Sequence, residues 1–384
     1  MSQRLFTSES VTEGHPDKVA DQISDAVLDA ILEGDPNARA GIETLISNGF
    51  CVVAGELKTS TYVPITDIVR QKLREIGYTH AEFGFDYRST GVLIAVGEQS
   101  PDVERGISGK AGAMGSADQG IVYGYACSET PEKMPLTLML SHKLAKELAL
   151  ARKNSVLPYL YPDGKVQVTL RYEEERAIAL EHVVVSAQHS AQVPMDVLKE
   201  QIIEDVIKPS LPKDLDCSGV QYHINPTGAF VIGGPQADTG LTGRKSIVDT
   251  YGGACPHGGG SLSGKDPSKM DRSGAYMARY IAKNLVAAGV ADRLLVQLAY
   301  VMGESEPVSL SVKTFGTGKV DDEVIAKAIP DIFPLKPKEI LEALDLLKPR
   351  YAATSVYGHF GRENEGFSWE VTDRVDAVRN RLGI

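Results

Sequence analysis

The chain has 384 residues, more than one ordinary hydrophobic core holds, so two or three domains are expected. Hydrophobic residues make up 42% and charged residues 24% of the chain, as in soluble globular proteins, and a net charge of −11 argues against a general nucleic-acid binder. The polar start argues against a signal peptide, and the lack of an apolar run of spanning length argues against a membrane protein. The four cysteines are scattered without a C-x-x-C pair, which argues against a zinc site and a disulfide framework: Cys51, Cys127, Cys217 and Cys255. Together these features favour a cytoplasmic protein.

The first clear element is a helix from Pro16 to Leu32, because apolar residues repeat there at helical spacing. His15 and Asp17 lie at its N-terminus, where free N–H groups attract phosphate. A simpler interpretation is that Asp17 only complements the helix dipole. Three aspartates on the opposite face are expected to be solvated: Asp21, Asp25 and Asp29.

A hairpin followed by a helix is predicted three times along the chain. The first hairpin turns at Asn48-Gly49, a strong hairpin signal, and carries Glu43 and Glu56, whose strand positions usually face solvent. The predicted strands and helices are 40–46, 50–56 and 65–76; 166–172, 178–186 and 195–207; and 293–302, 308–314 and 321–329. The repetition predicts an α+β fold of three similar domains, each a small sheet backed by helices. Further helices are expected over 136–152 and 275–288.

Two glycine-rich stretches interrupt this pattern. The segment from Gly97 to Gly120 has glycines that break regular structure, and so long a loop is usually a functional lid or disordered. The stretch from Pro256 to Ser273 has four glycines (Gly258, Gly259, Gly260 and Gly264) among Lys265, Lys269 and Arg272. Such a loop forms an anion-binding nest, and its Asp266 and Asp271 offer the oxygen ligands that Mg²⁺ prefers.

The second stretch narrowly misses the P-loop pattern. Gly259, Gly264 and Lys265 fit G-x-x-x-x-G-K, but Asp266 follows where Ser or Thr should hold Mg²⁺. We therefore expect a phosphate loop of another design, and an ordinary glycine-rich surface loop stays open as the alternative. A second glycine-basic cluster, GLTGRK, spans 240–245.

Several long motifs in one order resemble the S-adenosylmethionine synthetases of bacteria. They are HPDK from His15, GEQSPD from Gly97, GLTGRK from Gly240 and GGG…SGKDPSK up to Lys269, and the resemblance extends to YGHFGR at 357–362. Membership implies that ATP, methionine and water give S-adenosylmethionine, phosphate and diphosphate, with Mg²⁺ (two per site) and K⁺ as cofactors. It also implies a homo-oligomer, a tetramer of two dimers with active sites at the dimer interface.

The resemblance further implies three domains related by pseudo-threefold symmetry. In linear order these are 1–101, 121–232 and 233–384, with 102–120 as a flexible active-site loop. These boundaries follow the sequence alone, and the domains are free to exchange segments.

Site residues follow from the resemblance position by position. Residues that would bind ATP are His15, Asp163, Gly164, Lys165, Ala229, Phe230, Asp238, Arg244, Lys245, Ser261 and Lys265. Of these, five would be catalytic residues that stabilise the triphosphate: His15, Lys165, Arg244, Lys245 and Lys265. Residues that would contact methionine are Glu56, Gln99, Asp238 and Lys269. Asp17 and Asp271 would bind Mg²⁺, and Glu43 would lie at the K⁺ site.

The chain departs from the family pattern at two places. Ala229 stands where many relatives carry arginine, and Ser261-Leu262 replaces a more usual Ala-Phe. Phe230, the expected adenine-stacking residue, is retained. These changes predict altered nucleotide affinity and a retained activity.

These site residues suit attack by the neutral methionine thioether on the ribose C5′ carbon. This attack needs no general base, because the sulfur has a free lone pair. The enzyme must align the reactants and stabilise the leaving tripolyphosphate, which basic residues and Mg²⁺ do. Asp118 and Asp238 would favour the sulfonium. Two alternatives remain: a kinase or ATPase, which would leave ADP, and a non-catalytic nucleotide-binding scaffold, which would have no reason to retain the paired carboxylates and basic cluster.

Overall fold

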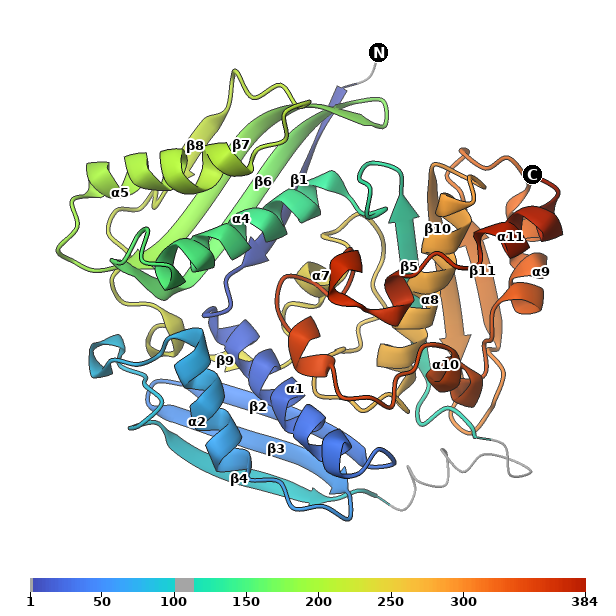
Figure 1. Ribbon diagram of the computed structural model, residues 1–384, viewed down its shortest axis with the longest axis horizontal. Coiled ribbons are helices and arrows are strands. Elements are labelled where there is room, and N and C mark those ends of the chain that lie inside the picture. The colour runs from blue at the N-terminus through green and yellow to red at the C-terminus, as the bar shows by residue number, and fades with distance from the viewer. Residues whose placement is uncertain (1–2, 101–113) are drawn as a thin grey trace.

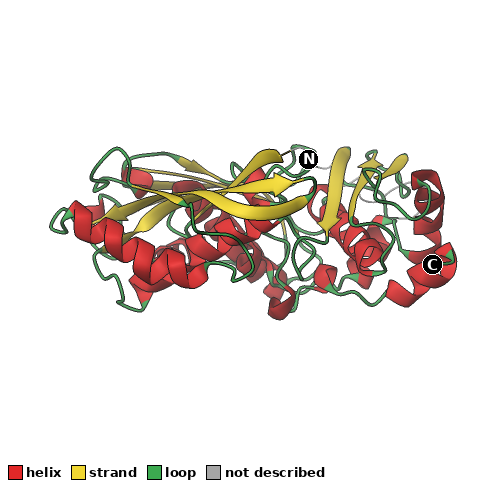
Figure 2. Cartoon of the chain, turned by 90° about the horizontal axis from the view of Figure 1, so that it is seen from above, coloured by secondary structure: helices red, strands yellow, loops and turns green. Residues whose placement is uncertain are grey.

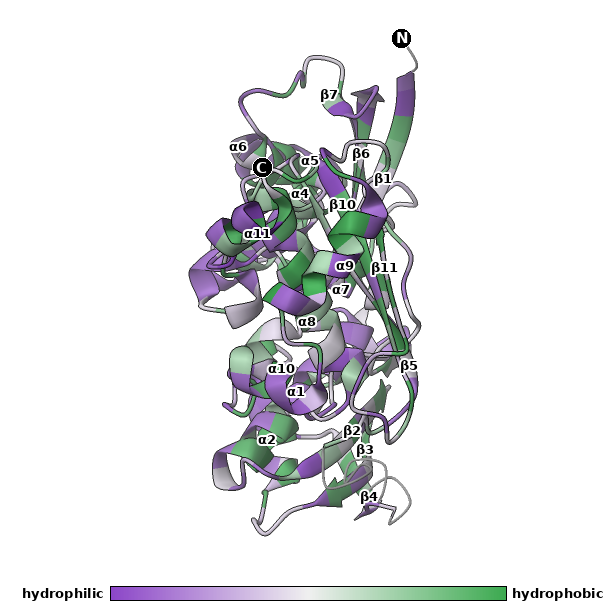
Figure 3. Cartoon of the chain, turned by 90° about the vertical axis from the view of Figure 1, so that its right-hand side faces the viewer, coloured by the Kyte–Doolittle hydropathy of each residue, from purple (hydrophilic) through white to green (hydrophobic). Residues whose placement is uncertain are grey.

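The computed structural model describes residues 3–100 and 114–384. Its strands form three separate sheets, and the helices lie on one side of them (Figures 1 and 2). Figure 3 shows the same two layers edge-on. The mixed sheets and helices confirm the predicted α+β class.

The first sheet joins the start of the chain to its middle. Its order is β1-β6-β7-β8, with β1 (Gln3–Val11) antiparallel to β6 (Leu160–Glu173), β6 antiparallel to β7 (Arg176–His189), and β7 parallel to β8 (Gln221–Ile224). Helix α4 (Leu136–Lys153) covers it because Leu140, Leu144 and Leu148 recur on one face and are buried with the sheet's valines.

The other two sheets share one larger core. The order β4-β3-β2-β9 comprises β4 (Gly91–Glu98), β3 (Phe50–Lys58), β2 (Arg39–Ser47) and β9 (Gly240–Leu241). The order β11-β10-β5 comprises β11 (Ser309–Lys313), β10 (Arg293–Tyr300) and β5 (Gly120–Cys127). Helices α1 (Pro16–Gly34) and α2 (Ile65–Ile76) pack on the former, and α8 (Met270–Ala287) on the latter.

The remaining helices have 11 residues or fewer. They are α5 (Met195–Gln201), which continues as a π-helix Ile202–Ile207 into α6 (Lys208–Ser210); α7 (Ser246–Asp249); α9 (Asp322–Ile332); α10 (Pro337–Ala343); α11 (Val375–Leu382); and single 3₁₀ turns at Ala81–Phe83, Gly234–Gln236, Tyr351–Thr354, Glu363–Glu365 and Ser368–Glu370. Within the described residues, no helix has the length and apolar content needed to cross a membrane.

Each sheet contains a strand that is distant in sequence from the others. β1 joins the sheet of the central segment, β5 joins that of the C-terminal segment, and β9 joins that of the N-terminal segment. The three hairpins and their helices were predicted correctly, whereas β1, β4, β5, β8 and β9 were missed. The predicted loop from Gly97 is also corrected, because Gly97 lies in β4.

The structure describes the predicted loop again only from residue 114. Residues 101–113, which make up much of the predicted lid, lie outside the part of the chain that the structure describes. Ser116 is held by backbone hydrogen bonds, its N–H donating to Glu304 O at 2.9 Å and its O accepting from Gly303 N at 2.9 Å. The end of the predicted loop therefore runs beside 302–304.

The aspartate face of α1 was predicted wrongly. Asp21 and Asp25 are fully buried, and Asp29 is half-buried. Their carboxylates accept hydrogen bonds from backbone N–H groups of distant segments, which replace the water that the sequence pattern implied.

Candidate functional site

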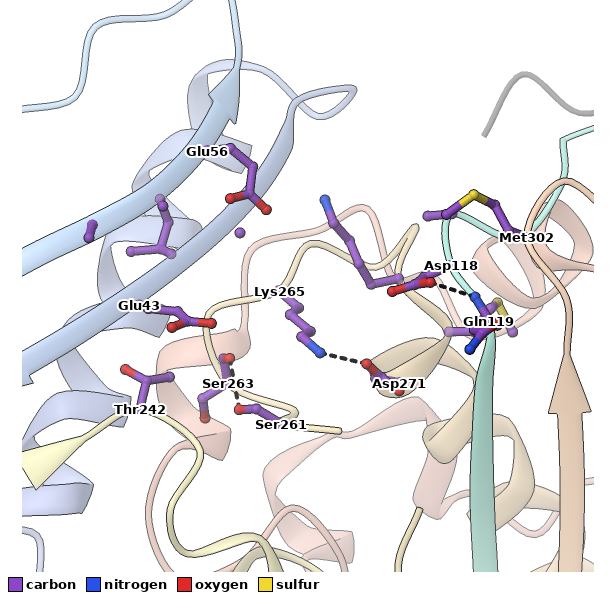
Figure 4. Close-up of a pocket in the computed structure, with 17 residues that line it drawn as sticks. Glu43, Glu56, Asp118, Gln119, Thr242, Ser261, Ser263, Lys265, Asp271 and Met302 are labelled. Atoms are coloured by element: carbon purple, nitrogen blue, oxygen red, sulfur yellow. Dashed lines mark hydrogen bonds and ion pairs between the residues drawn. The ribbon is translucent and has the colours of Figure 1, made fainter. Parts of the chain in front are cut away.

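A cavity of about 360 Å³ lies where the N-terminal sheet meets the glycine-rich loop (Figure 4). Glu43 and Glu56 enter it from β2 and β3, Asp118 from the segment before β5, and Lys265 with Asp271 from the loop and the start of α8. Its other lining residues are Gly41, Ile42, Ala54, Gly55, Ala117, Gln119, Thr242, Ser261, Ser263, Lys269, Met270 and Met302. Residues 41–56, 117–119, 242, 261–271 and 302, far apart in sequence, thus build one cavity that contains several charged side chains.

Lys265 and Asp271 form the centre of this cavity. Lys265 Nζ donates to Asp271 Oδ2 at 2.5 Å, and both side chains are about one quarter exposed. Figure 4 shows the two side chains pointing toward each other, with Glu43 and Glu56 across the cavity from Asp118. An ammonium group held near a carboxylate can bind a phosphate oxygen, while the carboxylate can bind a cation.

Glycines are required where this loop meets its neighbours. Gly264 has φ +79°, and a Cβ there would lie 1.9 Å from Ile42 O. Instead, Gly264 O accepts from Ile42 N at 2.8 Å, which holds the loop against β2. A Cβ at Gly260 would lie 2.3 Å from the Asp271 carboxylate. The glycines therefore allow the backbone to approach β2 and Asp271 closely.

Two residues of the loop are used for structure and not for the cavity. Asp266 was predicted as a possible metal ligand, but it is buried and accepts from Ala40 N at 2.8 Å and Ser268 N at 2.9 Å, and it pairs with Lys269. Arg272, predicted among the basic residues of the loop, points into the interior with a fully buried side chain.

A second polar cluster surrounds the N-terminus of α1. Lys245 Nζ donates to Asp17 Oδ2 at 2.7 Å, and Arg244 Nε lies 3.9 Å from Asp17 Oδ1. Although burial opposes it, the hydrogen bond and charge of Lys245 lower the pKa of Asp17. The carboxylate is therefore ionised at neutral pH.

His15 is the N-cap of α1, and its Nδ1 accepts from Asp17 N at 3.2 Å. Burial and the charge of Lys245 lower the pKa of His15 to about 3. The imidazole is therefore neutral at pH 7, and because Nδ1 is the acceptor, the ring proton lies on Nε2. A neutral ring that offers one N–H can donate a hydrogen bond to a phosphate oxygen.

The other predicted nucleotide residues lie on the central segment and the turn that follows it. Lys165 Nζ, on β6, pairs with Glu9 Oε2 at 2.7 Å. Asp163 Oδ2 accepts from Gly234 N at 2.8 Å, and burial raises the pKa of Asp163 to about 6. Gly164 O accepts from Thr12 N at 2.9 Å, which ties this strand to the segment before α1.

Phe230 N donates to His189 Nε2 at 3.1 Å, and its ring is half-buried. Ala229 and Asp238 are exposed. Gln99 lies directly after β4, next to the residues that the structure does not describe.

The structure therefore gathers ten of the predicted site residues into two clusters, and the other seven lie outside both. Glu43, Glu56, Ser261, Lys265, Lys269 and Asp271 line the cavity. Asp17 directly contacts His15, Arg244 and Lys245 in the other cluster. Sequence reasoning missed Gln119 and Met302 in the cavity lining, because no motif contains them. It also gave no role to Ser263, which lies in the SGKDPSK motif and lines the cavity.

Fold and site together define an α+β protein with two basic-carboxylate clusters suited to a polyphosphate and a divalent cation. Three family models match it in order: the S-adenosylmethionine synthetase N-terminal domain over residues 3–101, the central domain over 113–230 and the C-terminal domain over 232–371. The chain belongs to the S-adenosylmethionine synthetase family.

Similar proteins cover the chain almost end to end. An S-adenosylmethionine synthase of Helicobacter hepaticus is 58% identical over 380 residues, covering 99% of this chain and 98% of its own. That of Sulfurovum sp. is 57% identical and covers 99% of this chain and 99% of its own. That of Wolinella succinogenes is 58% identical and covers 99% of this chain and 98% of its own. These findings confirm the family that the motifs indicated.

Proposed function

We propose that this chain is a methionine adenosyltransferase that forms S-adenosylmethionine from ATP and methionine. The methionine sulfur attacks ribose C5′ and expels tripolyphosphate, which is hydrolysed to phosphate and diphosphate. The observation that carries the proposal is the pair of lysine–carboxylate clusters, Lys245–Asp17 and Lys265–Asp271, in a chain related over its full length to S-adenosylmethionine synthases.

The protein's own residues bind and orient the substrates in this reaction. His15, Lys165, Arg244, Lys245 and Lys265 stabilise the charge on the leaving triphosphate. Asp163, Gly164, Ala229, Phe230, Asp238 and Ser261 complete the ATP site. Glu56, Gln99, Asp238 and Lys269 contact methionine. The sulfur has a free lone pair, so none of these residues needs to act as a general base.

The carboxylates fit a Mg²⁺ ion that is held partly by substrate. Among the described residues, no three His, Cys, Asp or Glu side chains converge into a complete metal site. Mg²⁺ is usually bound through one or two carboxylates together with substrate phosphates, and Asp17 and Asp271 suit that arrangement. When bound, Mg²⁺ would neutralise phosphate charge, and two ions per site are proposed. Glu43, on the cavity wall, would lie at a K⁺ site.

We expect phosphate release that depends on both ATP and methionine, with Mg²⁺ and K⁺ present. The products should be S-adenosylmethionine, phosphate and diphosphate, and added tripolyphosphate should be cleaved as well. Formation of ADP would instead identify a kinase or ATPase. Nucleotide binding without turnover would identify a scaffold. An active preparation that leaves tripolyphosphate intact would contradict the hydrolysis step.

The open face of the sheets supports a homo-oligomer. The helices cover one side only (Figure 2), and large apolar side chains are exposed on the strands, among them Leu5, Phe50, Leu93 and Ile121. Such a surface is typical of subunit interfaces. We propose dimers, paired into a tetramer, in which the α1 cluster of one subunit meets the cavity of its partner. Sedimentation under assay conditions should show no active monomer, and a fully active monomer would overturn this assembly.

A further inference from the structure

Four aspartates of α1 lie at i, i+4 spacing along one helix face, and each accepts hydrogen bonds from the backbone of a segment distant in sequence. Asp17 accepts from Leu241 N at 3.1 Å, Asp21 from Gly243 N at 2.8 Å, Asp25 from Gly264 N at 2.8 Å, and Asp29 from Tyr351 N and Ala352 N, both at 2.8 Å. Helix α1 thus holds both glycine-basic loops and the C-terminal segment.

Asp25 makes the most extensive of these contacts. Its two oxygens accept a forked pair of hydrogen bonds from Arg272, with Nη1 at 2.7 Å and Nη2 at 3.0 Å. Both side chains are fully buried. A buried ion pair of this kind is stable only when both groups are fully hydrogen-bonded, which fixes their geometry.

Every remaining donor of Arg272 is also used. Nη1 donates to Lys265 O at 3.1 Å, Nη2 to Thr354 Oγ1 at 3.0 Å, and Nε to Tyr276 OH at 3.1 Å. The guanidinium lies 4.1 Å from the ring centroid of Tyr351. The Arg272 guanidinium is therefore held in one position, and it fixes the position of the Lys265 carbonyl.

We propose that Asp25 and Arg272 are positioning residues for Lys265. Asp25 binds the amide just before Lys265, and Arg272 binds the carbonyl of Lys265 itself, while Ile42 N holds Gly264 O. These bonds fix the backbone from which the Lys265 side chain reaches Asp271 in the cavity. This inference rests on the proposed function, in which Lys265 stabilises the leaving triphosphate.

The test is Asp25→Asn, with Asp29→Asn as its matched control. Both variants exchange a carboxylate for an amide on the same helix. Asp25 binds Arg272 and the loop directly, whereas Asp29 does not bind the loop and reaches Arg272 only through the 351–354 turn. Misplacing a catalytic group by about 1 Å can cost about 10² in rate. We expect Asp25→Asn to lower kcat by about 10- to 100-fold with less than about a 3-fold change in the KM for methionine, and Asp29→Asn to keep kcat within about 3-fold.

Two further measurements separate positioning from general loss of structure. In a Lys265→Ala background, Asp25→Asn should lose most of its effect on kcat, because residues acting through one another are not additive. Amide hydrogen exchange across 261–266 should be faster in Asp25→Asn than in Asp29→Asn. A full additive loss in the double variant, or unchanged exchange in this segment, would overturn the proposal. If Lys265→Ala alone kept its kcat, the role of Lys265 in the proposed function would fail instead, and exchange would still decide whether Asp25 holds the loop.

Discussion

Replacing Lys265 by alanine should lower kcat by about 10²- to 10³-fold, the usual cost of removing one preorganised donor from a developing negative charge. The KM for methionine should change far less. Lys265 Nζ lies in the cavity, 2.5 Å from Asp271 Oδ2, and is partly exposed, so it is available to a phosphate oxygen. Negative charge grows on the leaving group as the C5′–O bond breaks, and the interaction strengthens in the transition state.

A suitable control is Lys327→Ala, which removes the same charge from an exposed position on α9. Steady-state kinetics with both substrates varied would distinguish the two kinds of contact. A variant with unchanged kcat and only a higher KM for ATP would show that Lys265 binds ground state and transition state equally, and would contradict its catalytic role.

Local patterns in the sequence identified the helices and hairpins well, because those elements carry their own periodicity and turns. Helix α2 spans Ile65–Ile76 as predicted, and the Asn48-Gly49 turn joins β2 to β3. The strands that were missed depend on partners distant in sequence. β1 pairs with β6, β5 with β10, and β4 lies parallel to β3, so their partners could not be read from neighbouring residues.

The aspartates of α1 show why the site could be predicted only in part. A stripe of acidic residues on a helix is ordinarily a solvated face, and nothing in the sequence distinguishes water from the backbone N–H of Gly243 or Gly264 as the partner. Lys265 and Asp271, which the motifs assigned to one site, line the same cavity. The same motifs suggested that Asp266 is a metal ligand. The sequence could not show that Asp266 is buried and accepts a hydrogen bond from Ala40 N, because both features arise only in the folded chain.

A second large effect is expected on stability, from Glu370 near the C-terminus. Its carboxylate is buried and accepts from Arg279 at 3.1 and 3.0 Å, from Lys283 Nζ at 2.6 Å and from Gly361 N at 2.9 Å. Arg279 and Lys283 both lie on α8, the helix that begins beside Asp271. One carboxylate therefore joins the C-terminal segment to the helix that carries part of the site.

Glu370→Ala should reduce the free energy of unfolding by about 3–5 kcal/mol, because it leaves the Arg279 guanidinium buried without its charged partner. Lys283 is less affected, since its Nζ also lies 2.5 Å from Glu363 Oε1. Glu363→Ala is the matched control: that carboxylate is 44% exposed, and its removal leaves Lys283 paired with Glu370, so the cost should stay below about 1 kcal/mol. Denaturant unfolding at one protein concentration would measure both values, and equal losses in the two variants would contradict the role of Glu370.

The same pair of variants gives a pH dependence with a definite sign. Although burial opposes it, the charges of Arg279 and Lys283 lower the pKa of Glu370 below its usual value. A carboxyl with a lower pKa in the folded state contributes its stabilisation above the unfolded pKa of about 4.3, and loses it as the pH falls through the folded value. The difference in stability between wild type and Glu370→Ala should therefore be constant from neutral pH down to about 5 and shrink at more acidic pH. A difference that grew on acidification would mean that Glu370 is protonated in the folded protein, and the buried cations would then need another source of compensation.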